Sequence, residues 1–175
     1  MLTSLAFFTG LVLLVALERL AELVLSRRNA AWSLARGGRE TGSAHYAVMV
    51  VLHTGLLAGA LVEAFVRRPD VPVGLAAVML LLVVASQALR WWCIATLGRR
   101  WNTRVIVVPD LPLVRSGPYR FLRHPNYVAV VVEGLALPLV HACWVTALVF
   151  TVANAFVLAV RLRVENAALA TVPEA

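Results

Sequence analysis

Cysteine, lysine and acidic residues are scarce in this chain, and their scarcity excludes several classes of protein. Among 175 residues there are 2 cysteines, 9 acidic residues and no lysine. Cys93 and Cys143 lie in separate apolar runs, with neither a Cys-x-x-Cys partner nor a histidine at metal-ligand spacing. We therefore expect two small buried side chains, no disulfide framework and no metal site.

The motifs of the common nucleotide-binding folds are missing as well. No Gly-x-Gly-x-x-Gly follows a strand, and there is no phosphate-binding loop. Strand and helix patterns do not alternate, and no nucleophile lies in a recognisable triad context. A Rossmann-type cofactor site is therefore not expected.

Long apolar runs make up most of the sequence. Apolar residues form 61% of the chain and charged residues 14%, whereas a soluble domain is about half apolar and a quarter charged. Several runs approach the roughly 20 residues that cross a bilayer. The expected spans are Leu2–Leu25, His45–Val66, Val71–Leu97, Tyr127–Val140 and Cys143–Val160. We predict an all-α integral membrane protein with five transmembrane helices, forming one domain over residues 1–175.

The arginines are distributed unevenly between the two sides of such a bundle. The net charge of +7 would fit nucleic-acid binding, but the placement of the charges argues for a membrane instead, and we expect no nucleic-acid partner. With the N-terminus outside, the outer segments keep only Arg67 and Arg68. The inner segments hold Arg27, Arg28, Arg36, Arg39, Arg99, Arg100, Arg104, Arg115, Arg120, Arg123, Arg161 and Arg163. Such an excess of inner positive charge predicts an outer N-terminus and an inner C-terminus.

The last apolar stretch, Tyr127–Val160, is too long for one pass. Pro138 and His141 lie near its middle, so we predict a helical hairpin rather than one long kinked helix. The hairpin also keeps Arg161 and Arg163 on the inner side, which the kinked helix would not.

Five polar residues within the expected spans have two interpretations each. Glu18, Arg19 and Glu22 are either charges at a helix end or a buried functional group, because they share one side of a helix. His53 is either a hydrogen-bonded core residue or a functional one. Arg90 lies either at the inner interface or inside the protein, facing a cavity.

The segment from Gly98 to Asn126 has no window apolar enough to cross a membrane. Arg104–Val108 could form a short strand, but it has no obvious partner, and Pro109 and Pro112 prevent a continuous helix. Irregular backbone beside a membrane is tolerated where protein or a water-filled cavity satisfies it. We therefore expect this segment to fold over a pocket on the inner face.

Two polar motifs flank the last hairpin. The first combines Gly117-x-Tyr119 with Arg123-His124-Pro125-x-Tyr127, and the second places Glu165 four residues after Arg161. In this order and spacing they resemble the two signatures of the isoprenylcysteine carboxyl methyltransferase family of integral-membrane methyltransferases. The resemblance covers about residues 99–169. It implies a three-helix membrane scaffold over residues 1–97 and a cofactor-binding and catalytic part over residues 98–175.

The resemblance implies a site for S-adenosylmethionine, with S-adenosylhomocysteine as the product. It assigns cofactor contacts to Leu111, Pro112, Leu113, Val114, Tyr119, His124, Pro125, Asn126, Tyr127 and Glu165. It assigns substrate handling to Arg161. His124 is a further candidate for a catalytic base, because a histidine titrates near neutrality. Asn166 departs from a second glutamate that is frequent in the family, which suggests a different substrate or subfamily. The alternative for Arg161 and Glu165 is an intrahelical ion pair without a ligand.

The function that the resemblance implies is S-adenosylmethionine-dependent methylation of a lipophilic acceptor at an acidic oxygen. Prenylcysteine-like acceptors fit, and the first half of the chain resembles a bacterial branch that methylates alkylpyrones or alkylresorcinols. We expect the protein in the bacterial cytoplasmic membrane, with the active site facing the cytoplasm. Two alternatives stay open: a phospholipid amine N-methyltransferase, and a non-enzymatic membrane scaffold or small transporter.

Overall fold

The computed structural model describes residues 2–109 and 111–171. Its α-helices are α1 (Leu2–Leu34), α2 (Ser43–Arg67), α3 (Val73–Leu97), α4 (Pro125–Leu139) and α5 (Trp144–Leu169). Two short 3-10 helices, η1 (Gly98–Arg100) and η2 (Gly117–Arg120), and two strands, β1 (Arg39–Thr41) and β2 (Val105–Val107), complete the secondary structure of the described residues. The predicted all-α membrane fold is confirmed.

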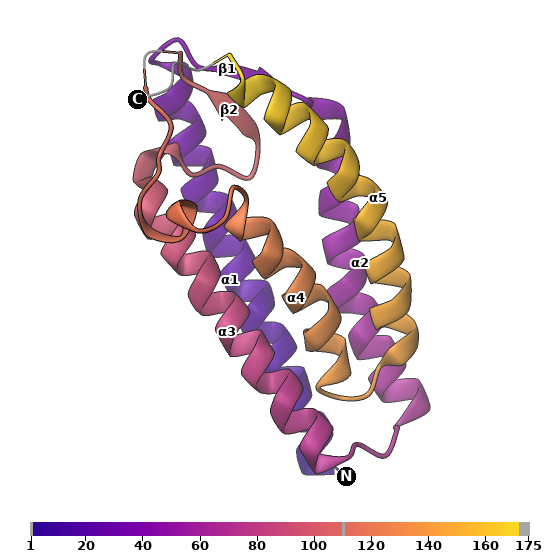
Figure 1. The fold of residues 1–175 in the computed structure, drawn as a ribbon. Helices are drawn as coiled ribbons and strands as arrows, with labels where there is room; N and C mark the ends of the chain where they lie inside the picture. The colour runs from indigo at the N-terminus through magenta and orange to yellow at the C-terminus, as the bar shows by residue number, and fades with distance from the viewer. Residues whose placement is uncertain (1, 110, 172–175) are drawn as a thin grey trace.

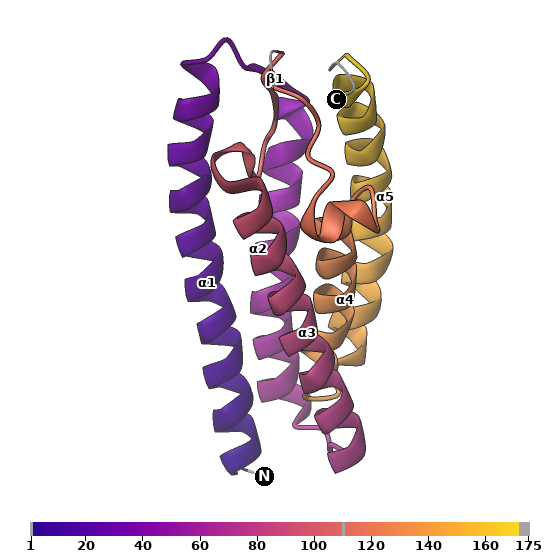
Figure 2. The same cartoon turned by 60° about the vertical axis from the view of Figure 1, so that its left-hand side comes forward.

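The helices run lengthwise in one bundle, with the two termini at opposite ends (Figures 1 and 2). The strands and the C-terminal end of α5 lie at the end far from the N-terminus. Among the described residues, three helical stretches are long and apolar enough to cross a membrane: Tyr46–Arg67, Val73–Arg100 and Trp144–Leu169. The apolar helix Pro125–Leu139 is shorter.

The surface of the bundle is apolar, whereas several charged groups are buried. Val51 and Phe156 are each 72% exposed, on α2 and α5. Glu22, Arg90 and Arg161 are each at most 5% exposed. This distribution is the reverse of that in a soluble protein, and it suits a bundle whose outer face contacts lipid tails.

The first helix extends further than we expected. The first expected span ends at Leu25, but α1 continues to Leu34. The polar side chains on this part of α1 face protein: the Ser26 hydroxyl lies 2.8 Å from the Thr103 hydroxyl, and the Asn29 amide donates to the Trp101 carbonyl over 2.7 Å. These polar side chains therefore contact the segment that follows α3. This contact stabilises the last part of α1 as a helix.

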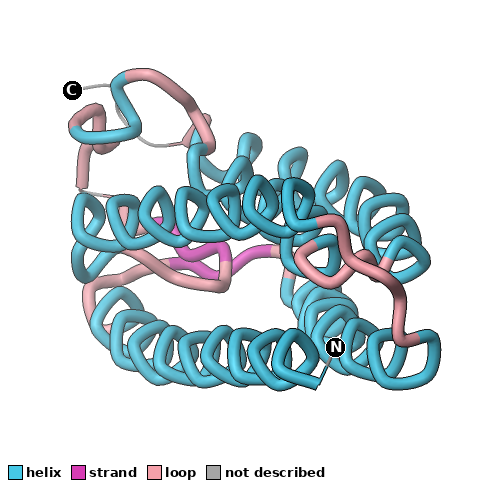
Figure 3. Tube along the Cα trace, turned by 90° about the horizontal axis from the view of Figure 1, so that it is seen from below, coloured by secondary structure: helices cyan, strands magenta, loops and turns pink. Residues whose placement is uncertain are grey.

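The short strand predicted around Arg104–Val108 does have a partner. It forms β2 and pairs antiparallel with β1, with Arg39 opposite Val107 and Thr41 opposite Val105. In the end-on view the strand pair lies across the middle of the bundle (Figure 3). The pairing ties the connection between α1 and α2 to the segment between α3 and α4.

The predicted helical hairpin is confirmed, because α4 ends at Leu139 and α5 begins at Trp144. The two helices approach closely at Gly134, where a Cβ atom would lie 2.0 Å from the Phe150 ring. Glu63 of α2 holds the start of α5, because its carboxylate accepts hydrogen bonds from the Val145 and Thr146 backbone amides over 3.1 and 2.7 Å. A carboxylate at a helix N-terminus satisfies amides that have no partner within the helix.

Candidate functional site

A large cavity, about 870 Å³ in volume, lies at the bundle end that carries the strands. The segment between α3 and α4 forms much of its wall, as predicted, and the ends of α4 and α5 form the rest. Its lining includes Arg161 and nine of the ten residues predicted to bind the cofactor: Leu111, Pro112, Leu113, Val114, Tyr119, His124, Asn126, Tyr127 and Glu165. The tenth, Pro125, is buried in the first turn of α4, where proline is pre-organised for a helix.

Gly117 is required by the shape of the chain at the Gly-x-Tyr motif. Its φ of +55° is a conformation that favours glycine, and a Cβ atom there would lie 2.4 Å from the Thr96 hydroxyl. The turn carries Tyr119 to the cavity wall, where its hydroxyl is hydrogen-bonded to the buried Cys93 thiol. Burial raises the pKa of Tyr119, so this residue is a neutral phenol at physiological pH.

Arg161 and Glu165 are joined through Tyr127. The Arg161 Nε donates to the Tyr127 hydroxyl over 2.7 Å, and that hydroxyl donates to the Glu165 carboxylate. Arg161 also donates from Nη2 to the Thr103 carbonyl over 2.7 Å, which fixes its guanidinium against the segment after α3. Arg161 is 5% exposed and lines both cavities, whereas Glu165 lines only the larger.

His124 lines the larger cavity, and each of its ring nitrogens lies near a side-chain oxygen. Its Nε2 lies 2.9 Å from the Asn166 Oδ1, and its Nδ1 lies 3.4 Å from the Glu165 Oε1. Hydrogen bonding to Glu165, followed by that to Asn166, raises the pKa of His124 above its ordinary value. With an oxygen acceptor beside each ring nitrogen, the ring is suited to donate two hydrogen bonds rather than to accept a proton.

The contact between His124 and Glu165 predicts a dependence of stability on pH. A histidine whose pKa is raised on folding stabilises the folded state fully below its unfolded pKa, about 6.5, and loses this contribution as pH rises through the folded value. We expect the thermal midpoint of the detergent-solubilised protein to fall between about pH 6 and 9, and to fall less in His124→Gln. Identical pH profiles for the two proteins would contradict this.

The larger cavity offers the groups that S-adenosylmethionine requires. Arginine side chains suit a carboxylate, and they are supplied by Arg100, Arg104, Arg115, Arg120 and Arg123. The Glu165 carboxylate can accept hydrogen bonds from amino or hydroxyl groups. Trp101 and the apolar stretch Val105–Val108 offer a surface for an aromatic base. The residues present therefore fit this cofactor in charge and shape.

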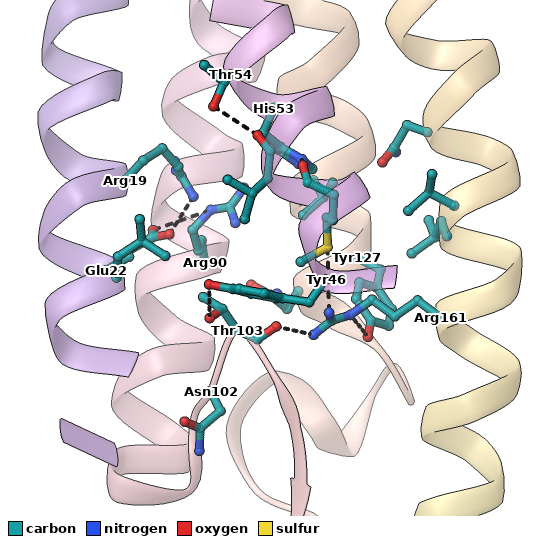
Figure 4. A pocket seen from close by; sticks show the side chains of 18 of the residues that line it. Arg19, Glu22, Tyr46, His53, Thr54, Arg90, Asn102, Thr103, Tyr127 and Arg161 are labelled. Atoms are coloured by element: carbon teal, nitrogen blue, oxygen red, sulfur yellow. Dashed lines mark hydrogen bonds and ion pairs between the residues drawn. The ribbon is translucent and has the colours of Figure 1, made fainter. Parts of the chain in front are cut away.

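A smaller cavity of about 160 Å³, which we did not predict from the sequence, lies between the helices beside the larger one. It is mostly apolar, and Figure 4 shows side chains from several helices converging on it. Both cavities are lined by Trp101, Asn102, Asn126, Tyr127 and Arg161, which therefore form a shared wall. Arg161 and Tyr127 are thus positioned where the contents of the two cavities would meet.

Buried charges form one network beside the smaller cavity; we call Glu18, Arg19, Glu22, Arg90 and Glu133 the ionic cluster. Arg19 lies 2.6 Å from Glu22 and 3.3 Å from Glu133. Arg90 also pairs with Glu133 and lies 3.7 Å from Glu22. Of the two interpretations given above, the structure favours burial: Arg90 is inside the protein, and Arg19, Glu22 and Arg90 line the cavity.

Comparisons with known proteins identify the family of this chain. The model of the isoprenylcysteine carboxyl methyltransferase (ICMT) family matches residues 78–171. The uncharacterized protein YpbQ of Bacillus subtilis is 34% identical over 165 residues, covering 93% of this chain and 96% of YpbQ. An uncharacterized protein of Haemophilus influenzae is 25% identical over 156 residues, covering 86% of this chain and 88% of its own length. No solved structure matches.

A shorter match involves a protein of another kind. The heme-binding subunit MsrQ of the protein-methionine-sulfoxide reductase of Agrobacterium fabrum is 38% identical over 60 residues. The match covers 34% of this chain and 27% of MsrQ.

Proposed function

Because this chain belongs to the isoprenylcysteine carboxyl methyltransferase family, we propose that it uses S-adenosylmethionine to methylate an oxygen of a lipophilic acceptor. The family makes it a methyltransferase of the membrane. The cofactor, the oxygen and the acceptor class are the parts that we propose.

One observation carries the proposal. Residues from two segments far apart in the sequence, 111–127 and 161–170, line one cavity of about 870 Å³. Cavities of roughly 300–1,000 Å³ are typical of small-molecule and cofactor sites. A scaffold or a transporter would not require two polar motifs to converge on a pocket with the donors and acceptors described above.

S-adenosylmethionine supplies, when bound, an electrophilic methyl group on a sulfonium. The arginines of the larger cavity would hold its carboxylate, and Glu165 would accept hydrogen bonds from its amino or hydroxyl groups. Arg161 and Tyr127 would orient the acceptor oxygen at the shared wall. Positioning and exclusion of water by the apolar lining can supply much of the acceleration of such a displacement.

The smaller cavity supports a lipophilic acceptor. Its lining includes Val50, Leu57, Val130, Val157 and Leu158, and it lies among helices whose outer faces are apolar. An acceptor with a long tail would reach such a cavity from the bilayer. Prenylcysteine-like, alkylpyrone-like and alkylresorcinol-like molecules share this property.

The test has two steps. Calorimetric titration with S-adenosylhomocysteine is expected to show binding to the folded protein; no binding would exclude the cofactor. Incubation with labelled S-adenosylmethionine then compares four acceptors: a prenylcysteine, an alkylpyrone, an alkylresorcinol and phosphatidylethanolamine. We expect an O-methylated product, identified by mass and fragmentation. Methylation of phosphatidylethanolamine alone would identify the protein as an N-methyltransferase.

We further propose that the N-terminus lies outside the bacterial cytoplasmic membrane and that the larger cavity opens to the cytoplasm. The inner excess of arginine and the opposite ends taken by the termini support this orientation. Cysteines introduced at Ser4 and Thr171 are expected to react with an impermeant thiol reagent from opposite sides of the membrane. Labelling of both from one side would contradict the orientation.

A further inference from the structure

His53 of α2 lies on the wall of the smaller cavity (Figure 4). Its Nδ1 is 2.8 Å from the Met49 carbonyl oxygen. Because a carbonyl can only accept a hydrogen bond, Nδ1 carries the ring proton, and Nε2 has the free lone pair. Within the part of the chain that the structure describes, Nε2 has no hydrogen-bond partner. In the neutral ring, Nε2 is therefore the atom that can accept a proton.

Met49 contacts both His53 and Arg161, the residue that we assign to the acceptor. Met49, one helical turn before His53, has its sulfur 3.5 Å from the Arg161 Nη1, and one turn rises about 5.4 Å. The His53 ring also makes an edge contact with the Phe150 ring, with centroids 5.3 Å apart. These contacts fix the imidazole on the same small cavity as Arg161 and Tyr127.

The ionic cluster lies on the wall of the same cavity as His53, to which it contributes Arg19, Glu22 and Arg90. It contains three carboxylates and two guanidiniums, so its fully ionised net charge is −1. The Glu22 Oε1 is buried without a hydrogen-bond partner. Charges interact strongly where water is excluded. Arg161 and the hydroxyls of Tyr46 and Tyr127 are the other titratable groups on the cavity wall.

We propose that His53 is the proton acceptor for a neutral hydroxyl group on the methyl acceptor; this inference rests on the proposed function. As the acceptor oxygen forms its bond to the methyl carbon, the O–H bond breaks and the proton passes to the His53 Nε2. The S–CH₃ bond breaks with its electron pair staying on sulfur, which becomes a neutral thioether. One positive charge thus moves from the sulfonium to the imidazolium, beside the ionic cluster.

This role specifies the class of acceptor. A carboxylate is already ionised near pH 7 and needs no base. A phenol, with a pKa of about 10 like that of tyrosine, is neutral at the same pH and does need one. The geometry therefore points to a weakly acidic hydroxyl, phenolic or enolic, rather than a carboxylate.

The experiment compares wild-type protein with His53→Gln and His53→Phe, the second of which retains a ring against Phe150. The probes are an alkylresorcinol with a long saturated chain and a prenylcysteine. For the alkylresorcinol we expect kcat to fall by about 100-fold or more in both variants, and the remaining rate to rise steadily with pH as the phenol ionises. Affinity for S-adenosylhomocysteine should be unchanged.

His141→Gln is the matched control, because His141 is buried outside the lining of both cavities. The pH–rate profile of this variant should be that of the wild type.

Two outcomes would overturn the inference. One is a wild-type kcat and pH–rate profile for both His53 variants, which would make His53 a packing residue. The other is wild-type protein that binds S-adenosylhomocysteine but does not methylate the alkylresorcinol, with or without activity on the prenylcysteine. Failure of wild-type protein to bind S-adenosylhomocysteine is a separate result, which would reject the proposed function itself.

Discussion

Replacing Arg161 with alanine is expected to abolish methyl transfer while changing affinity for S-adenosylhomocysteine by less than about threefold, or under 1 kcal/mol. The guanidinium lies on the wall that both cavities share, so its loss removes the group that orients the acceptor oxygen. The hydrogen bond from Tyr127 to Glu165 does not depend on it directly. Single-turnover rates and calorimetric titration, made on the same preparation, measure the two effects.

Glu165→Gln provides the opposite pattern as a control for Arg161→Ala. It should weaken S-adenosylhomocysteine binding by about tenfold, or 1.4 kcal/mol, because it removes the carboxylate that lines only the larger cavity. If Arg161 and Glu165 served only to stabilise their helix, both folded variants would keep wild-type turnover. Loss of cofactor affinity in Arg161→Ala would instead show that its guanidinium binds the cofactor carboxylate.

Arg90→Ala is expected to cause the largest loss of stability, about 3–5 kcal/mol. Arg90 is 5% exposed and pairs with Glu133 and Glu22. Its removal leaves the buried carboxylates of Glu22 and Glu133 and the half-buried one of Glu18 with Arg19 as the remaining guanidinium of the cluster. Unfolding in mixed micelles by a denaturing detergent, followed by circular dichroism, would measure the change.

Two further variants separate the effect of burial on stability from the effect of charge in Arg90→Ala. Arg104→Ala breaks a pair with Glu40 in which the arginine side chain is 45% exposed, and it should cost less than about 1 kcal/mol. The double variant Arg90→Met, Glu133→Leu should recover much of the stability, because apolar residues can replace a buried ion pair. If the double variant is as unstable as Arg90→Ala, the cluster must stabilise the fold by more than the mutual neutralisation of its charges.

The apolar runs and the two polar motifs were sufficient to predict the membrane fold, the hairpin and the residues that surround the larger cavity. These features depend on local composition and on a motif order that resembles one family. Hairpin formation followed from the length of Tyr127–Val160 and from Pro138, both visible in the sequence.

The features that we missed depend on contacts between distant segments. Ser26 and Asn29 are polar because they face Thr103 and Trp101, and no local pattern distinguishes such residues from a loop. Strands of three residues carry too little pattern to reveal a partner more than 60 positions away. The cluster around Arg19 and Arg90 was open to two interpretations, because charges at a helix end and charges in a bundle interior have the same spacing within one helix.

The two cavities draw on different parts of the chain, which has a consequence for how such proteins diversify. The lining of the larger cavity comes, apart from Ser33, from residues 97–170, within the stretch that matches the family. Nearly half of the lining of the smaller cavity comes from α1 and α2, before that stretch begins. Substitutions in the first two helices can therefore reshape the smaller cavity while leaving nearly all of the lining of the larger one unchanged. Under the function proposed above, a lineage with this arrangement could acquire new lipids as substrates and still inherit its methyl-donor site intact.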